Sequence, residues 1–324
     1  MLIIGFEGKA PPRTRHRFVA GYVLFARNLG SLDEIADLNR ELAAMADPNE
    51  PPLILSIDQE GGRVQRIRAP LTVWPPMATV GEGSEADAES LGRKLGEEIF
   101  ALGFNVDYAP VLDVHSNPNN PIIGDRAFCT NPQRAAKLAL AFWRGLEASG
   151  VRGCGKHYPG HGDTATDSHL ELPVVDKSLD HLRACELVPF AAAAQADMPL
   201  FMTAHVIYPQ VDPLPATMSQ RWLTEILRGE LGYRGVIVSD DLDMKAVAEG
   251  FPLEQVVLQG LRAGVDVFLA CRDVAVQQHA LEIMERAHRD EAASRMRIDD
   301  ATARITAFRQ TLKQPSARWR SIIR

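Results

Sequence analysis

The feature that most constrains the fold of this chain is a series of eight short apolar segments, separated by stretches with helical periodicity. The segments are rich in residues that favour β-strands. They cover residues 2–6, 22–27, 53–57, 104–108, 152–156, 200–205, 235–239 and 266–270. Because these runs are nearly continuously apolar, we expect strands that are buried on both faces, as in a parallel sheet covered by helices.

Helix signals lie between these segments. Ser31 and Glu34 form a capping box at the start of one helix, and another begins at Asn131 with Pro132 in its first turn and ends at Gly150. Further helices are expected at 84–102, 178–196, 219–231, 254–263 and 274–288, with a last helix near 298–313 packed outside the strands. The crossover at 9–21 has the poorest helical pattern, which makes the first connection an exception to the alternation.

The alternation of strands and helices over 324 residues, with no linker or internal repeat, favours one (β/α)8 barrel over an open doubly wound sheet. The expected architecture is a single α/β domain of the TIM-barrel type that covers residues 1–324. Functional groups of such barrels gather just beyond the C-terminal ends of the strands. The sequence therefore indicates where a site should lie.

Charge and composition exclude several classes of partner. A formal net charge of -7 and a pI near 5.7 argue against nucleic acid, which requires a basic face. The N-terminal sequence MLIIGFEGKAPPRTR lacks the pattern of a signal peptide, and no apolar stretch reaches membrane-spanning length. The four cysteines are scattered without a CxxC pair. We expect a soluble cytoplasmic protein without a membrane partner.

Polar residues follow the expected strands at the ends where a barrel would place its site. They are Glu7, Arg27, Asn28, the DQEGGR motif from Asp58, Asp113, the KHYPGHGD motif from Lys156, His205, the SDDLD motif from Asp240, and Arg272. Loops are polar in any protein, which accounts for part of this pattern. It does not account for an Asp or His that so often follows an apolar run directly.

Asp240 is the first carboxylate after the apolar run 235–239, and we expect it at the mouth of the barrel. A carboxylate at that place can act as a metal ligand, a general base or a nucleophile. Asp241 and Asp243 have a second interpretation, because either could cap the helix that follows.

Five further residues predict a polar pocket. Carboxylate, guanidinium and other charged groups can bind a polyhydroxylated ligand through paired hydrogen bonds. The five are Asp58, Arg66, Arg126, Lys156 and His157, and all are expected in loops that follow strands. Singly each would be an ordinary surface charge, but together at one rim they indicate a binding site.

The stretch HYPGHGDTATDSH contains three histidines but lacks a regular metal-binding spacing such as HExxH, so we expect no metal and no cofactor. Asp167 and His169 are two residues apart and can meet in a loop. The carboxylate would then orient and support the imidazole, which makes His169 a candidate for proton transfer. Gly160 and Gly162 permit an irregular loop there.

Four long motifs make the sequence similar to glycoside hydrolase family 3, and in particular to its single-domain bacterial β-N-acetylglucosaminidases of peptidoglycan recycling. They are DQEGGRVQR, IIGDRAF, KHYPGHGDTATDSHLELP and GVIVSDDLDM. The resemblance implies a retaining enzyme in which Asp240 is the nucleophile and His169, assisted by Asp167, is the general acid/base. It also implies that Asp58, Arg66, Arg126, Lys156 and His157 hold a terminal N-acetylglucosamine.

Alternatives remain at this point. A β-glucosidase or β-xylosidase of the same family is the nearest one, although the Asp167-Ser168-His169 pattern is not expected there. A metal-dependent barrel hydrolase and a sugar-binding protein without catalysis are the others. The resemblance further implies that the chain lacks the second domain of the larger family members, and we expect a monomer that acts on muropeptide-derived carbohydrate. Transfer to phosphate remains open, because a neutral imidazole repels an anion less than a carboxylate does.

Overall fold

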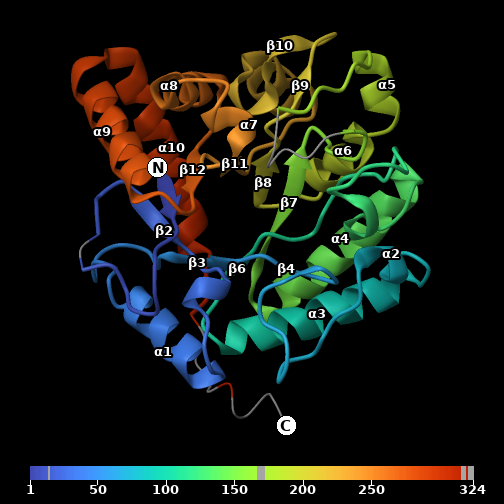
Figure 1. The fold of residues 1–324 in the computed structure, drawn as a ribbon, viewed down its shortest axis with the longest axis horizontal. Helices are drawn as coiled ribbons and strands as arrows, with labels where there is room; N and C mark the ends of the chain where they lie inside the picture. The colour runs from blue at the N-terminus through green and yellow to red at the C-terminus, as the bar shows by residue number, and fades with distance from the viewer. Residues whose placement is uncertain (14, 166–171, 315–318, 320–324) are drawn as a thin grey trace.

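The computed structural model describes residues 1–13, 15–165, 172–314 and 319, and Figure 1 shows its ribbon. Eight parallel strands close into a barrel in the order β1-β12-β11-β8-β7-β6-β3-β2. They are β1 (Leu2–Ile4), β2 (Val19–Val23), β3 (Ile54–Ile57), β6 (Val106–Asp107), β7 (Arg152–Tyr158), β8 (Leu200–Thr203), β11 (Val236–Asp241) and β12 (Val267–Ala270). The predicted (β/α)8 barrel is confirmed.

Helices follow seven of these strands within the part of the chain that the structure describes. They are α1 (Leu32–Ala43), α3 (Glu85–Ala101), α4 (Pro132–Ser149), α5 (Leu179–Ala184), α6 (Leu187–Gln195), the π-helix η4 (Arg221–Glu230), α8 (Leu253–Ala263), α9 (Val274–Asp290) and α10 (Ala292–Gln310). The described residues between β1 and β2 form no helix, in keeping with the poor pattern at 9–21.

Several predicted boundaries need correction. The helix predicted at 178–196 is two helices that meet at Cys185 and Glu186, and the last helix begins and ends earlier than 298–313. The strand predicted at 22–27 is shifted toward the N-terminus, because Ala26–Asn28 forms a 3-10 turn (η1).

Two strands are longer than their apolar runs. β7 continues to Tyr158 and β11 to Asp241, so His157 and Asp240 lie on strands and not in the loops predicted for them, and Lys156 lies within β7, at the last residue of the predicted strand 152–156. Apolar periodicity could not show this, because the strand continues with polar residues that point into a site. The rigid sheet therefore carries these three side chains directly.

Short elements complete the chain on the side where the strands end. Two hairpins, β4 (Gln59–Gly61) with β5 (Val64–Gln65) and β9 (Ile207–Tyr208) with β10 (Asp212–Pro215), follow β3 and β8. The others are α2 (Met77–Val80), α7 (Lys245–Ala248) and the 3-10 turns η2 (Gly124–Arg126) and η3 (Ala216–Met218). Within the described residues, no helix combines the length and the apolarity that a membrane crossing requires.

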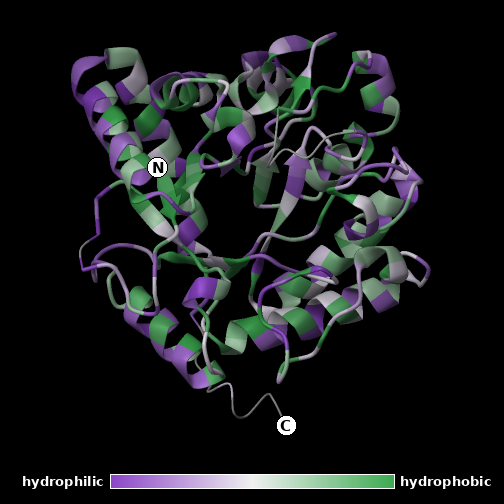
Figure 2. Cartoon of the chain, in the orientation of Figure 1, coloured by the Kyte–Doolittle hydropathy of each residue, from purple (hydrophilic) through white to green (hydrophobic). Residues whose placement is uncertain are grey.

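Alternate residues of the strands fill two separate cores. Ile54 and Val238 point into the barrel, whereas Leu55 and Ile237 point outward against the helices. Figure 2 shows several green strands, with β7 partly purple where its polar residues lie, surrounded by helices that are green on some residues and purple on others. The last turns of α10 contribute Phe308 to the inner core, so this outer helix also covers the N-terminal end of the barrel.

A buried carboxylate organises the chain near the start of β12. Asp266 is fully buried and accepts hydrogen bonds from Arg228 Nη2 at 2.9 Å, Arg297 Nη2 at 2.8 Å and the backbone N–H of Ile237 at 2.9 Å. It therefore links η4, α10 and the start of β11. Removing one partner of such a group leaves the others with uncompensated charge.

We predict that Asp266→Ala lowers the free energy of unfolding by about 3–5 kcal/mol, because Arg228, Arg297 and a backbone N–H lose their common acceptor. Urea titration measures the loss. Asp300→Ala is the matched control, since Asp300 pairs with Arg297 at 3.3 Å but is largely exposed, and it should cost at most about 1 kcal/mol. Equal losses in the two variants would contradict a special role for Asp266.

Candidate active site

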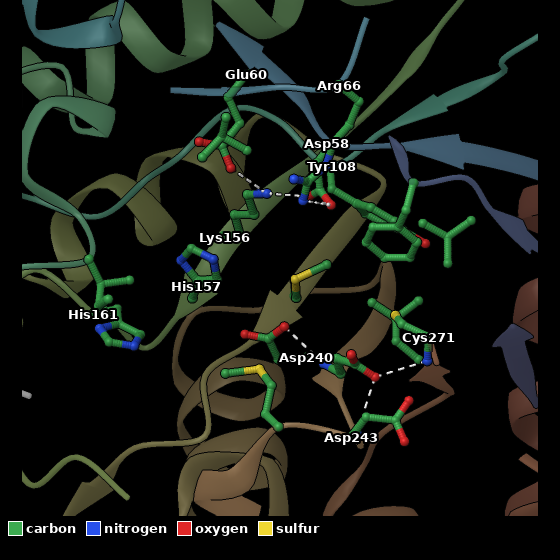
Figure 3. Close-up of a pocket in the computed structure, with 18 of the residues that line it drawn as sticks. Asp58, Glu60, Arg66, Tyr108, Lys156, His157, His161, Asp240, Asp243 and Cys271 are labelled. Carbon is green, nitrogen blue, oxygen red and sulfur yellow. Dashed lines mark hydrogen bonds and ion pairs between the residues drawn. The ribbon is translucent and has the colours of Figure 1, made fainter. Parts of the chain in front are cut away.

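A cavity of about 380 Å³ opens where the barrel strands end, at the place predicted from the sequence. Its size is within the usual range for a small-molecule site. Six of the predicted site residues line it together: Asp58, Arg66, Arg126, Lys156, His157 and Asp240. Figure 3 shows Lys156 and His157 on one strand, with Asp240 across the cavity from them.

Lys156 lies at the centre of a buried ionic network. Its Nζ is 2.8 Å from Asp58 Oδ1 and 2.6 Å from Glu60 Oε1, and the side chain is only 2% exposed (Figure 3). Burial lowers the pKa of Lys156, but the two carboxylates outweigh it and hold the pKa above its ordinary value. Lys156 is therefore a permanent cation. It lines the cavity and also holds the carboxylates of Asp58 and Glu60 in place.

Two arginines complete this network. Arg126 binds Glu60 with both ends of its guanidinium, Nε to Oε2 and Nη2 to Oε1, each at 2.8 Å. Arg66 Nη2 donates to Asp58 Oδ2 at 3.2 Å. Burial raises the pKa values of both carboxylates, but the neighbouring cations outweigh it, so that the pKa of Asp58 falls below its ordinary value and that of Glu60 falls to about 2.

Glu60 is the functional residue that the sequence analysis missed. It stands in β4, two positions after Asp58 in the DQEGGR motif, and both carboxylates reach Lys156 Nζ. The spacing of two was a usable signal, because residues two apart in an extended segment point to the same side. The residue was passed over because a carboxylate beside several cations has no distinctive pattern in the sequence.

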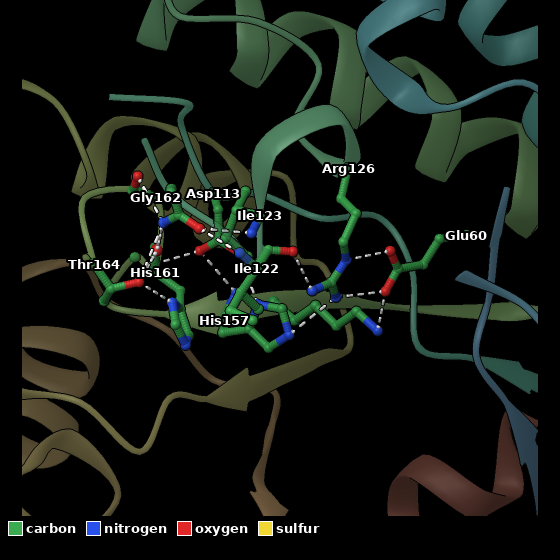
Figure 4. A network of polar contacts seen from close by, with 12 residues as sticks. Glu60, Asp113, Ile122, Ile123, Arg126, His157, His161, Gly162 and Thr164 are labelled. Carbon is green, nitrogen blue, oxygen red and sulfur yellow. Dashed lines mark hydrogen bonds and ion pairs between the residues drawn. The ribbon is translucent and has the colours of Figure 1, made fainter. Parts of the chain in front are cut away.

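His157 is oriented by Asp113. The His157 Nδ1 atom is 2.7 Å from Asp113 Oδ2, and Asp113 Oδ1 accepts the backbone N–H groups of His157 at 3.1 Å and His161 at 2.6 Å (Figure 4). Burial raises the pKa of Asp113, but His157 and His161 outweigh it and lower that pKa. An ionised Asp113 requires a proton on Nδ1, which leaves Nε2 to face Arg126 at 3.5 Å as an acceptor.

Asn120 joins the segment that carries Arg126 to the segment after β7. Its Nδ2 donates to the carbonyl oxygens of His161 at 2.8 Å and Gly162 at 3.0 Å, while its Oδ1 accepts the N–H groups of Ile122 and Ile123 (Figure 4). All of these donors and acceptors belong to the backbone. Asn120 thus fixes the turn that presents Arg126 to Glu60.

Asp240 lies at the end of β11, and its Oδ1 accepts the backbone N–H of Asp241 at 2.8 Å (Figure 3). The helix-capping interpretation of Asp241 and Asp243 is wrong, because α7 begins after Met244 with no side-chain cap. Asp241 Oδ1 instead accepts the N–H groups of Asp243 at 3.1 Å and Cys271 at 3.0 Å. Asp241 therefore ties the end of β11 to the end of β12.

Asp167 and His169, the predicted proton-transfer pair, lie outside the described residues. Among the residues that are described, no group of three or more His, Cys, Asp or Glu side chains is arranged to hold a metal ion. Among the described residues, the geometry brings the five predicted binding groups and the carboxylate of Asp240 into one pocket. A closed (β/α)8 barrel with such a pocket at its C-terminal strand ends has the architecture of a barrel enzyme.

Comparison with known proteins defines the family. Residues 8–308 match the glycosyl hydrolase family 3 N-terminal domain. A β-hexosaminidase of Pseudomonas aeruginosa is 43% identical over 274 residues, which cover 84% of this chain and 81% of that protein. The chain belongs to glycosyl hydrolase family 3 and is a glycoside hydrolase, as the sequence motifs predicted.

Solved structures agree. A family 3 β-N-acetylglucosaminidase from Paenibacillus sp. superposes with a TM-score of 0.91 and 37% identity; the match covers 96% of this chain but 61% of that longer one. NagZ from Neisseria gonorrhoeae gives a TM-score of 0.84 and 33% identity, over 99% of this chain and 91% of that one. The same Neisseria protein in complex with N-trifluoroacetyl-D-glucosamine matches with a TM-score of 0.80 and 32% identity, over 99% and 95% of the two chains.

Asp241 gives a prediction about the pH dependence of stability. Burial, followed by the charge of Asp243, raises its pKa from 3.8 to about 7. Between these two pH values the unfolded chain has lost the proton and the folded chain retains it, so stability falls as the pH rises through this window. Asp241→Asn has no proton to lose and should gain up to about 2.5 kcal/mol relative to the wild type between pH 5 and pH 8.

Urea titrations of both proteins at the two pH values measure this gain. Asp300→Asn serves as the control, because Asp300 is largely exposed and its substitution should give the same difference from the wild type at both pH values. An Asp241→Asn difference that does not change with pH would mean that Asp241 is ionised throughout.

Proposed function

We propose that the protein is a retaining exo-β-N-acetylglucosaminidase that removes terminal β-linked N-acetylglucosamine. One observation carries the proposal: the carboxylate of Asp240 faces, across one small cavity, the cluster of Asp58, Arg66, Arg126, Lys156 and His157. The names of the related β-hexosaminidase and β-N-acetylglucosaminidase, and the N-trifluoroacetyl-D-glucosamine complex of the Neisseria neighbour, support this substrate class.

The charge balance of the pocket suits an uncharged sugar. Among the described residues, five carboxylates and five cations line the cavity: Asp58, Glu60, Asp240, Asp241 and Asp243, and Arg66, Arg126, Lys156, Lys245 and Arg272. A phosphate or carboxylate ligand would add charge that this set does not compensate, whereas hydroxyl groups can donate to the carboxylates and accept from the cations. The pocket therefore recognises hydrogen-bonding groups without favouring either sign of ligand charge.

The proposed reaction is a double displacement. Asp240 attacks the anomeric carbon and forms a glycosyl ester as the bond to the leaving oxygen breaks, and His169, supported by Asp167, gives that oxygen its proton. Water then attacks the same carbon, His169 takes the proton of the water, and Asp240 departs as a carboxylate. The roles of Asp167 and His169 rest on the match of their motif to the family.

The natural substrate that we propose is a 1,6-anhydro-muropeptide fragment of peptidoglycan, processed by a monomeric enzyme in the cytoplasm. The resemblance of the four sequence motifs to the recycling enzymes supports this assignment. A β-glucosidase or β-xylosidase of the same family is the second candidate, and the Asp-Ser-His pattern at residues 167–169 disfavours it.

We predict that the wild type releases nitrophenol from the β-N-acetylglucosaminide far faster than from the β-glucoside, and that chelator does not change the rate. Asp240→Ala should be folded and almost inactive on both, because it lacks the group that forms the covalent bond. The comparison of the two kcat/KM values measures the preference. A higher value for the glucoside would support the second candidate, and inactivation by chelator would support a metal-dependent hydrolase.

A separate labelling experiment tests whether Asp240 is the nucleophile. A 5-fluoro N-acetylglucosaminyl fluoride should accumulate as a covalent adduct, since fluorine slows both steps and the good leaving group favours the first. Peptide mapping of the labelled wild type should place the adduct at Asp240. A label outside residues 235–245 would remove Asp240 from this role.

We predict that His169→Ala loses activity in proportion to how much the leaving group needs a proton. Loss on a natural disaccharide-like substrate should be about 10²–10⁴-fold, the range of general acid–base catalysis, and the loss of the glycosylation rate on a dinitrophenyl glycoside should be smaller. Azide should then restore the second step, because it needs no base. Steady-state and single-turnover kinetics separate the two steps.

Asp167→Asn is the graded control for this experiment. It retains the imidazole and disturbs only its tautomer and charge support, so it should show the same pattern in weaker form. Equal losses for all leaving groups, without rescue by azide, would mean that His169 binds the substrate and does not transfer a proton.

A further inference from the structure

The strand that carries Asp240 is irregular at that residue. Along the pair of β11 and β12, Val238 is opposite Val267 and Asp241 is opposite Leu269, so three steps on β11 match two steps on β12. β11 therefore contains one extra residue between Val238 and Asp241, which is a β-bulge. A bulge next to an active site can turn a side chain that a regular strand would point elsewhere.

Ser239 stabilises the bulge from the side of β12. Its hydroxyl accepts the backbone N–H of Leu269 at 3.1 Å and donates to the carbonyl oxygen of Asp240 at 2.7 Å. The side chain is fully buried and does not line the cavity. At the bulge the regular backbone hydrogen bonds between β11 and β12 are interrupted. The Ser239 hydroxyl replaces them by accepting from the N–H of Leu269 and donating to the carbonyl oxygen of Asp240.

His205 stabilises the bulge from the side of β8. Its Nε2 is 3.2 Å from the carbonyl oxygen of Asp241, and its Nδ1 is 3.0 Å from the hydroxyl of Thr217, which also contacts Thr203 at 2.7 Å. A carbonyl oxygen only accepts, so Nε2 carries the proton and Nδ1 accepts from Thr217. Burial lowers the pKa of His205, which favours this neutral form.

These contacts determine where the carboxylate of Asp240 points. The backbone N–H of Asp241 occupies Oδ1 of Asp240, which leaves Oδ2 as the oxygen free to form a bond (Figure 3). Ser239 holds the carbonyl of the same peptide group, that of Asp240, and His205 holds the carbonyl of the next peptide group, that of Asp241. The direction of the free oxygen therefore depends on two buried side chains that lie outside the cavity lining.

We propose that Ser239 and His205 are positioning residues that hold this bulge and thereby aim Asp240 at the anomeric carbon of the bound sugar. The inference rests on the proposed function, because it assumes that Asp240 is the nucleophile. Groups that react must lie within a few tenths of an ångström of their productive geometry, and a misplacement of about 1 Å can cost about 10²-fold in rate. The sugar itself contacts other residues, so loss of the bulge should change the rate and not the binding.

The test uses two pairs of variants of the full chain. Ser239→Ala and His205→Leu remove the supporting groups, whereas Ser239→Thr and His205→Gln retain a hydroxyl and an N–H donor. Tyr233→Phe is the matched control, because the Tyr233 hydroxyl also donates to a buried carbonyl of β11, that of Val236 at 3.1 Å, but at the opposite end of the strand.

Three quantities are measured: the rate constant for labelling of Asp240 by saturating 5-fluoro N-acetylglucosaminyl fluoride, the Ki of N-acetylglucosamine, and the fraction of sites that finally become labelled. Ser239→Ala and His205→Leu should be labelled about 10²-fold more slowly per competent site, with an unchanged Ki. Ser239→Thr and His205→Gln should recover much of the rate. Tyr233→Phe should lower only the thermal midpoint.

The outcomes separate the two hypotheses. If the wild type is labelled at Asp240 and both disruptive variants react at its rate, the positioning roles are excluded and the proposed function stands. A parallel rise of Ki, or a loss explained entirely by fewer competent sites, also excludes them, since it indicates a binding or a folding role. A wild type that is neither labelled at Asp240 nor active on the N-acetylglucosaminide overturns both.

Discussion

Eight parallel strands that close into a barrel leave an interior that only side chains can fill. The rest of this structure depends on the change of those side chains from apolar to charged along the barrel axis. Near the strand starts the interior is apolar and is covered by the end of α10. At the strand ends a fully buried Lys156 replaces the apolar layer. A buried ammonium is tolerated only with close carboxylates, so Asp58 and Glu60 must be held beside it. The same carboxylates that compensate the charge of Lys156 also line the pocket.

Regular strands alone would not bring His157 and Asp240 into this pocket. The pairing of β7 with β8 shifts between Lys156 and Tyr158, and that of β11 with β12 shifts between Val238 and Asp241, so His157 and Asp240 both lie at irregular positions of their strands. In a regular strand neighbouring side chains alternate between the two faces. The bulges allow two consecutive residues, Lys156 and His157, to face the same cavity, and they place Asp240 across the cavity from both. Local departures from sheet geometry are thus part of the site.

The sequence alone predicted the eight strands, their closure and the end of the barrel that carries the site, because apolar runs and helix caps are local signals. It also predicted six residues that the structure brings into one cavity. It did not predict that His157 and Asp240 lie on strands, since apolar periodicity stops where a strand turns polar. The bulge at Asp240 was missed because it depends on the neighbouring strand β12, and the ion pairs of Glu60 were missed because Arg126 and Lys156 are distant from it in the sequence. The capping interpretation of Asp241 failed in the same way, since its partner Cys271 lies at the end of the next strand.

The charged groups around Lys156 are coupled, so none of them acts independently of the others. Glu60 binds Arg126 and Lys156 at once, and Asp58 binds Lys156 and Arg66 at once, so each of these two carboxylates holds two cations in place. Groups that share partners in this way act as a unit, and the effects of removing them do not add. A substitution of Glu60 would act on a bound sugar through Arg126 and Lys156 even where Glu60 itself does not touch it. Under the proposed function, recognition of the sugar would therefore be a property of the whole network around Lys156, in which the carboxylates compensate a buried cation.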